Sequence, residues 1–184
     1  MEASDVSADL TRVLVSEAEI HAKLAELARR IEADYPDDRP LLVGVLKGAV
    51  MVMADLAREL RIHIDMDWMA VSSYGAGTQS SGVVRILKDL DTDLSGRCVL
   101  IVEDIIDSGL TLSWLKENLG LRGAKSVEIC ALLRKPDAVK VEVDVKYLGF
   151  DIPNDFVVGY GLDFDQSYRN LRDVAILAPH VYEH

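Results

Sequence analysis

One segment in the middle of the chain combines two adjacent acids with a loop suited to phosphate binding. Residues 99–111 read VLIVEDIIDSGLT, in which four apolar residues lead to Glu103 and Asp104. The second half, DSGLT, places Gly109 at the start of an expected helix, with hydroxyl donors at Ser108 and Thr111. A helix N-terminus offers unpaired N–H groups and a partial positive charge, and glycine lets the backbone approach an anion closely. The loop therefore predicts a phosphate cradle, although serine and threonine there are also ordinary helix caps.

The two acids narrow the kind of phosphate compound that could bind. Bare carboxylates repel phosphate, by about 4 kcal/mol for unit charges roughly 4 Å apart at a near-surface dielectric. The repulsion is avoided if Glu103 and Asp104 accept hydrogen bonds from sugar hydroxyls or act through Mg²⁺, which prefers one or two carboxylates together with substrate oxygens. The segment thus predicts a site for a phosphorylated ribose with Mg²⁺. The alternative is a solvated acidic end of a strand.

The pattern around this segment predicts the elements that position it. Ser16 and Glu19 fit a helix-capping box, and apolar residues follow at helical spacing to about Ala33. Strands are expected near residues 12–15, 41–46, 64–72, 83–88, 98–102 and 126–133, and helices at 50–60 and after Thr111. Residues 103–111 would then form the turn of a right-handed βαβ unit. We therefore expect an α/β fold, a mostly parallel sheet flanked by helices, with ligands at the carboxyl ends of its strands.

Residues 99–111 closely resemble the phosphoribosyl-diphosphate motif of the type I phosphoribosyltransferases, and EDIIDSG is the wording of the hypoxanthine-guanine phosphoribosyltransferases. The resemblance extends over roughly residues 41–178. It implies one domain over residues 1–184, with a small purine-binding hood formed by the N-terminal arm and about residues 135–184. It also implies purine salvage: Mg²⁺-dependent transfer of the 5-phosphoribosyl group from 5-phosphoribosyl 1-diphosphate to hypoxanthine or guanine, giving IMP or GMP and diphosphate.

The resemblance also implies which residues bind the substrates and the metal. Those expected at the phosphoribosyl diphosphate are Lys47, Gly48, Ser73, Tyr74, Glu103, Asp104, Asp107, Ser108, Gly109, Leu110, Thr111 and Arg169. Those expected at the purine are Lys135, Phe156, Val157 and Asp163. The metal ligands implied are Glu103, Asp104 and Asp163, the last binding a second metal or a water on it.

Individual roles follow from the same resemblance. Lys135 would contact the exocyclic oxygen of a 6-oxopurine, Phe156 would stack on the base, and the backbone of Val157 would read its edge. Asp107 is the candidate base for the N7 proton, and its alternative role is to cap the phosphate loop. Taken alone, Lys47 would be a surface lysine and Phe156 a core residue.

Composition limits the possible partners. The net charge of −11, from 31 acidic and 20 basic residues, argues against nucleic-acid binding and so against a regulator that senses the sugar diphosphate and binds RNA or DNA. No G-x-G-x-x-G follows a strand, which argues against a dinucleotide-binding module. An acidic N-terminus and the lack of a long apolar stretch predict a cytoplasmic protein without membrane contact. The family implies a homodimer or homotetramer, and a sister enzyme that uses xanthine stays open.

Overall fold

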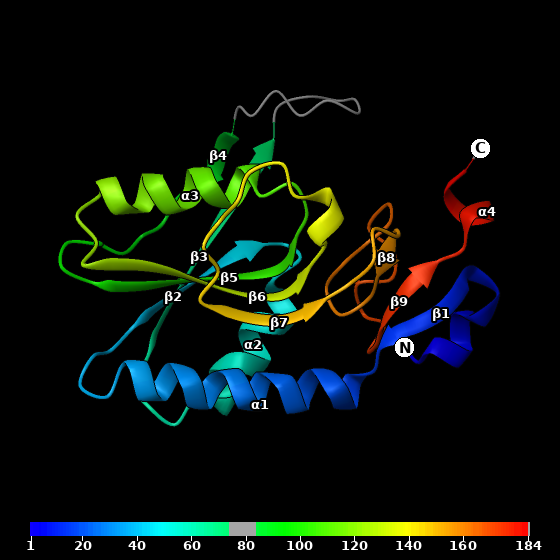
Figure 1. Ribbon diagram of the computed structural model, residues 1–184, viewed down its shortest axis with the longest axis horizontal. Helices are drawn as coiled ribbons and strands as arrows, with labels where there is room; N and C mark the ends of the chain where they lie inside the picture. Colours follow the sequence, from blue (N-terminus) through cyan, green and yellow to red (C-terminus); the bar gives the residue numbers. More distant parts are fainter. Residues whose placement is uncertain (74–83, 184) are drawn as a thin grey trace.

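The structure is a computed structural model that describes residues 1–73 and 84–183 (Figure 1). Two short 3₁₀ helices are η1 (Ala3–Asp9) and η2 (Pro136–Ala138). The α-helices are α1 (Glu17–Asp34), α2 (Val50–Glu59), α3 (Leu110–Leu121) and α4 (Pro179–Tyr182). The strands are β1 (Leu10–Val15), β2 (Leu41–Leu46), β3 (Asp65–Ser73), β4 (Val84–Lys88), β5 (Cys98–Ile106), β6 (Ser126–Arg134), β7 (Tyr147–Asp151), β8 (Val157–Val158) and β9 (Val174–Leu177). Within these described ranges, no helix has the length and apolar character needed to cross a bilayer.

The large sheet has six strands in the order β4-β3-β2-β5-β6-β7. All neighbouring pairs are parallel except β3 with β4. Figure 1 shows α1 and α2 on one face and α3 on the other. Two clusters of buried apolar side chains fill the spaces between the sheet and these helices. This arrangement confirms the predicted α/β fold with a mostly parallel sheet.

Local signals account for the first helix. Ser16 Oγ accepts a hydrogen bond from the N–H of Glu19 at 3.4 Å, and the Glu19 carboxylate accepts one from the N–H of Ser16 at 2.8 Å. This is the predicted capping box, which satisfies two donors that a helix start leaves unpaired. Ile20, Leu24 and Leu27 lie on the buried face of α1 against the sheet.

The strand order of the large sheet reverses between the neighbouring strands β2 and β5. The chain leaves β2 through α2 toward β3 on one side, and leaves β5 through α3 toward β6 on the other. In open α/β sheets, such a topological switch point opens a crevice at the carboxyl ends of the two strands. The fold therefore places a binding crevice beside Leu46 and the end of β5.

One predicted boundary is wrong. Residues 103–111 are expected to form a turn, but β5 continues through Glu103 and Asp104 to Ile106. The reason is pairing with β6, which extends to Ile106 opposite Arg134, whereas pairing with β2 stops at Val102. Glu103 and Asp104 are therefore held on a strand that is open on its β2 side.

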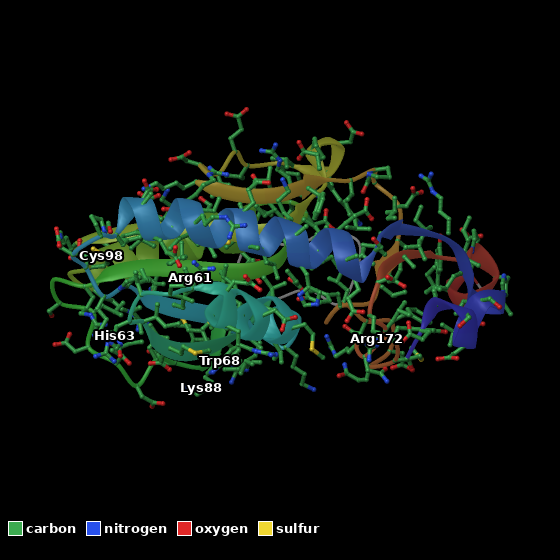
Figure 2. The ribbon with its side chains drawn as sticks, turned by 90° about the horizontal axis from the view of Figure 1, so that it is seen from below. Arg61, His63, Trp68, Lys88, Cys98 and Arg172 are labelled. Carbon is green, nitrogen blue, oxygen red and sulfur yellow. The ribbon has the colours of Figure 1, made fainter. Side chains whose placement is uncertain are left out.

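A second, small sheet lies beyond the carboxyl ends of the large one (Figure 1). It has the order β1-β9-β8 and is antiparallel. Arg172, two residues before β9, pairs with Glu17 in the first turn of α1 at 3.1 Å and with Glu2 in the N-terminal arm at 2.9 Å. Figure 2 shows Arg172 beside this end of α1, with Cys98 at the opposite end of the molecule.

Candidate active site

A cavity of about 280 Å³ lies at the crevice between β2 and β5. It brings together predicted residues from two separate segments of the chain. Those that line it are Gly48, Glu103, Asp104, Asp107, Ser108, Gly109 and Thr111. Val45 and Leu46 complete one wall from β2, so the cavity lies at the switch point of the sheet.

The acid pair lies within this cavity with little access to water. Glu103 is 8 % exposed. Burial raises the pKa of Glu103 well above its ordinary value, and the neighbouring Asp104 carboxylate raises it further. Burial also raises the pKa of Asp104 to about 6, against the effect of hydrogen bonds and of the Arg169 charge. Two acids in this environment favour a cation or a hydroxyl donor beside them.

The acid pair fits Mg²⁺ shared with a substrate. A Cβ on Gly48 would lie 1.7 Å from Asp104 Oδ2, so the loop after β2 contacts this carboxylate at a distance that only glycine permits. In residues 1–73 and 84–183, no group of three or more His, Cys, Asp or Glu side chains could hold a metal. Glu103 and Asp104 offer carboxylate oxygens, and Mg²⁺ is commonly bound by one or two carboxylates together with phosphate oxygens of a substrate.

The loop from Asp107 to Thr111 has the geometry of an anion site. Gly109 is the N-cap of α3 with a left-handed φ of 78°, and it offers no side-chain acceptor to the first turn. A Cβ there would lie 2.3 Å from the carbonyl oxygen of Val141. Ser108 Oγ accepts from the N–H of Leu110 at 3.4 Å. The first turn of the twelve-residue helix α3 therefore directs N–H groups toward the cavity.

Two predicted cations meet at a residue that sequence reasoning missed. The peptide bond preceding Lys47 is cis. Lys47 Nζ donates to Gln166 Oε1 at 3.2 Å, and Arg169 Nη2 approaches the same oxygen at 3.4 Å. Arg169 also donates to the carbonyl of Gly161 at 2.7 Å and pairs with Asp163 at 2.8 Å. Arg169 Nε is buried and has no acceptor among the described residues.

Nothing in the sequence around Gln166 signals this role. Gln166 is an exposed polar residue with a left-handed φ of 63°, and 119 residues separate it from Lys47. Its N–H donates to Asp163 Oδ2 at 2.8 Å, which holds the loop in this conformation. Only the tertiary structure reveals that it joins the two cations.

The residues predicted for the purine lie outside the lining of the 280 Å³ cavity. Lys135 follows β6 and is 9 % exposed, and its N–H donates to the carbonyl of Ile106 at 2.9 Å. Phe156 is 39 % exposed and immediately precedes β8, where Val157 pairs with Ile176. Two further residues are predicted at the phosphoribosyl diphosphate: Ser73 ends β3, and Tyr74 lies outside the described residues.

A sequence profile for the phosphoribosyl transferase domain matches residues 16–165. The chain belongs to the phosphoribosyltransferase family. This phosphoribosyltransferase is 55 % identical to the hypoxanthine-guanine phosphoribosyltransferase of Mycobacterium bovis over 181 residues, covering 95 % of this chain and 90 % of the relative.

Solved structures agree with the family. The crystal structure of a hypoxanthine phosphoribosyltransferase from Staphylococcus aureus matches with a TM-score of 0.95 and 42 % identity, covering 98 % of each chain. A structure of the Trypanosoma cruzi hypoxanthine phosphoribosyl transferase matches with a TM-score of 0.90 and 41 % identity. The match covers 95 % of this chain and 94 % of that one. The predicted family and the type I phosphoribosyltransferase fold are thus confirmed.

Proposed function

We propose that this phosphoribosyltransferase transfers the 5-phosphoribosyl group of 5-phosphoribosyl 1-diphosphate to hypoxanthine or guanine, releasing diphosphate with IMP or GMP. The observation that carries the proposal is the cavity between β2 and β5, where the buried Glu103 and the partly buried Asp104 lie beside the start of α3. A ribose with both hydroxyls and phosphate matches this combination of acceptors and N–H donors. The 55 % identity to the Mycobacterium bovis enzyme supports the same assignment.

The sugar diphosphate would be held by the core of the molecule. Ser108, Gly109, Leu110 and Thr111 would bind the 5-phosphate through backbone N–H and hydroxyl groups. Glu103 and Asp104 would accept from the ribose hydroxyls or hold Mg²⁺, which when bound supplies positive charge to the departing diphosphate. Lys47 and Arg169 would bind that diphosphate, and its oxygens would replace the Gln166 oxygen that both cations now share. Gly48 would give close backbone access, and Ser73 and Tyr74 would belong to the start of a flexible lid that closes over the site.

The purine would be held between the end of β6 and the small sheet. The buried Lys135 would donate to the exocyclic oxygen of a 6-oxopurine, which favours hypoxanthine and guanine over adenine. Phe156 would stack on the base, and the backbone of Val157 would read its edge. Asp107, exposed at the mouth of the cavity, would accept the N7 proton as the sugar carbon is attacked, with capping of the phosphate loop as its alternative role. Asp163 would hold a second metal or a water on it.

The organisation of the chain is part of the same proposal. Residues 1–184 would form one domain, with the N-terminal arm and about residues 135–184 as the purine-binding hood. The antiparallel contacts of β1 with β9 and of β9 with β8 support the hood, because they join the two ends of the chain in one sheet. We further propose a cytoplasmic homodimer or homotetramer, which sedimentation at micromolar concentration and cell fractionation would test.

A spectrophotometric assay tests the proposed reaction directly. The protein, Mg²⁺ and 5-phosphoribosyl 1-diphosphate are incubated with hypoxanthine, guanine, xanthine or adenine in separate wells. We expect turnover with hypoxanthine and guanine and little with adenine. Turnover with xanthine alone would move the assignment to a sister enzyme. A lack of turnover with all four bases would contradict the proposed function.

A further inference from the structure

Three aromatic rings gather where the purine is proposed to bind. Phe156 and Tyr182 stack, with ring centroids 5.1 Å apart and 24° between the ring planes. Phe164 meets both rings edge-on, with its centroid 5.8 Å from that of Phe156 and 6.5 Å from that of Tyr182. Stacked and edge-to-face pairs are the preferred arrangements of aromatic rings, so these three side chains fix one another's orientation.

Backbone hydrogen bonds bring Tyr182 to this position. The N–H of Leu177 at the end of β9 donates to the carbonyl of Phe156 at 2.9 Å. Helix α4 follows after a single residue, and the N–H of Val181 donates to the carbonyl of Ala178 at 3.0 Å. The turn of α4 thus returns the chain toward Phe156. The contact between the two rings is therefore set by the same strand pairing that holds Phe156.

We infer that Tyr182 is a positioning residue for the purine: it stacks on one face of Phe156 and so presents the other face to the base. The inference rests on the proposed function. An aromatic ring has two faces, and Phe156 remains 39 % exposed although Tyr182 covers one of them. The base would then become the third member of a stack built on Tyr182 and Phe156.

Tyr182 would act by orienting Phe156 in advance of binding. A lone phenylalanine side chain at a surface rotates freely. A base that stacks on it must offset the entropy that the side chain loses when it is held in one orientation. Tyr182 and Phe164 restrict this rotation before the base arrives. None of the three rings lines the cavity that is proposed for the sugar diphosphate. The effect of Tyr182 should therefore fall on purine affinity and spare the sugar diphosphate.

Steady-state kinetics of Tyr182→Ala, Tyr182→Leu and Tyr182→Phe test the inference. KM is measured for guanine at saturating 5-phosphoribosyl 1-diphosphate, and for the diphosphate at saturating guanine. Because a stacked aromatic pair contributes modestly beyond its buried area, we expect KM for guanine to rise about three- to tenfold in Tyr182→Ala. KM for guanine should rise by a similar factor in Tyr182→Leu, which keeps apolar volume without a ring. Tyr182→Phe should keep the wild-type KM for guanine. KM for the sugar diphosphate should change less than twofold in all three variants.

The possible outcomes distinguish a failure of this inference from a failure of the proposed function. A wild-type protein inactive with every base refutes the proposed reaction. An active wild type with unchanged KM for guanine in Tyr182→Ala and Tyr182→Leu refutes the role of Tyr182 alone. A lower KM for guanine would refute it too, because Tyr182 would then occupy the place of the base. Equal rises in both KM values, with a lowered melting temperature, would reduce Tyr182 to a structural residue.

Discussion

Replacing Gly48 with alanine should disable the site while leaving the fold intact. Gly48 follows β2 and touches the carboxylate of Asp104 across the crevice. A Cβ added there would lie 1.7 Å from Asp104 Oδ2 and 2.6 Å from Asp104 Cγ. Because real Cβ contacts are essentially never shorter than 3.0 Å, the two groups must separate by at least 1.3 Å (3.0 minus 1.7).

The size of the effect follows from this displacement. A shift of about 1 Å in a group that orients substrate can lower the rate roughly 100-fold, or about 2.7 kcal/mol. We therefore expect kcat/KM of Gly48→Ala to fall about 100-fold. The contact is with the end of a side chain, so rotation of Asp104 relieves it without moving the sheet. The free energy of unfolding should fall by no more than about 1–3 kcal/mol.

A second glycine provides a matched control. Gly120 lies in α3, and an added Cβ there would have no heavy atom within 4 Å. Gly120→Ala should leave kcat/KM unchanged and should stabilise the protein by about 0.5–1 kcal/mol, since alanine favours the helix. Both variants are assayed with guanine and 5-phosphoribosyl 1-diphosphate, and both are unfolded in urea. If Gly48→Ala keeps kcat/KM within twofold of wild type, the contact between Gly48 and Asp104 is not needed for catalysis and the reasoning fails.

Three further predictions concern other parts of the molecule. Burial raises the pKa of Asp67, but hydrogen bonds from Trp68, Thr92 and Asp91 outweigh burial and hold the pKa below its usual value. Asp67→Asn should therefore lower the free energy of unfolding by about 1–3 kcal/mol at pH 7, and urea melts at successively lower pH should show the difference disappearing as wild-type Asp67 protonates. Gln166→Glu places a carboxylate between Lys47 and Arg169, so KM for 5-phosphoribosyl 1-diphosphate should rise roughly tenfold, while Gln166→Met should raise it less. Burial raises the pKa of Cys130 to about 12, so a thiol reagent at pH 8 should label Cys130 only after unfolding, as mass spectrometry of the labelled peptide would show.

The parts of the molecule that the sequence predicts well are those set by neighbours in the chain. The capping box at Ser16 depends on residues three apart, and it is present as predicted. The apolar run of β2 predicts a strand buried on both faces, because its two neighbours and the helices on both sides exclude water. The loop after β5 lines the cavity because glycine and small polar residues begin α3 there.

The parts that the sequence does not predict depend on distant partners. The sequence predicts that β5 ends at Val102, whereas pairing with β6, a separate segment, extends the strand to Ile106. Gln166 meets Lys47 through a loop in which Tyr160 and Gln166 have positive φ, a conformation that these two residue types do not signal. The stacking of Tyr182 on Phe156 likewise depends on the register of β9 against β8.

The pairing of β1 with β9 has a consequence during synthesis on the ribosome. The two strands begin at Leu10 and Val174, so 164 residues separate them (174 minus 10). At about 5–20 residues per second, β1 is translated roughly 10–30 s before β9 exists. The strands of the large sheet are all translated by Asp151. A nascent chain can therefore complete the crevice for the sugar phosphate while its small sheet is still unpaired, and β1 is the segment that a chaperone would have to protect in that interval.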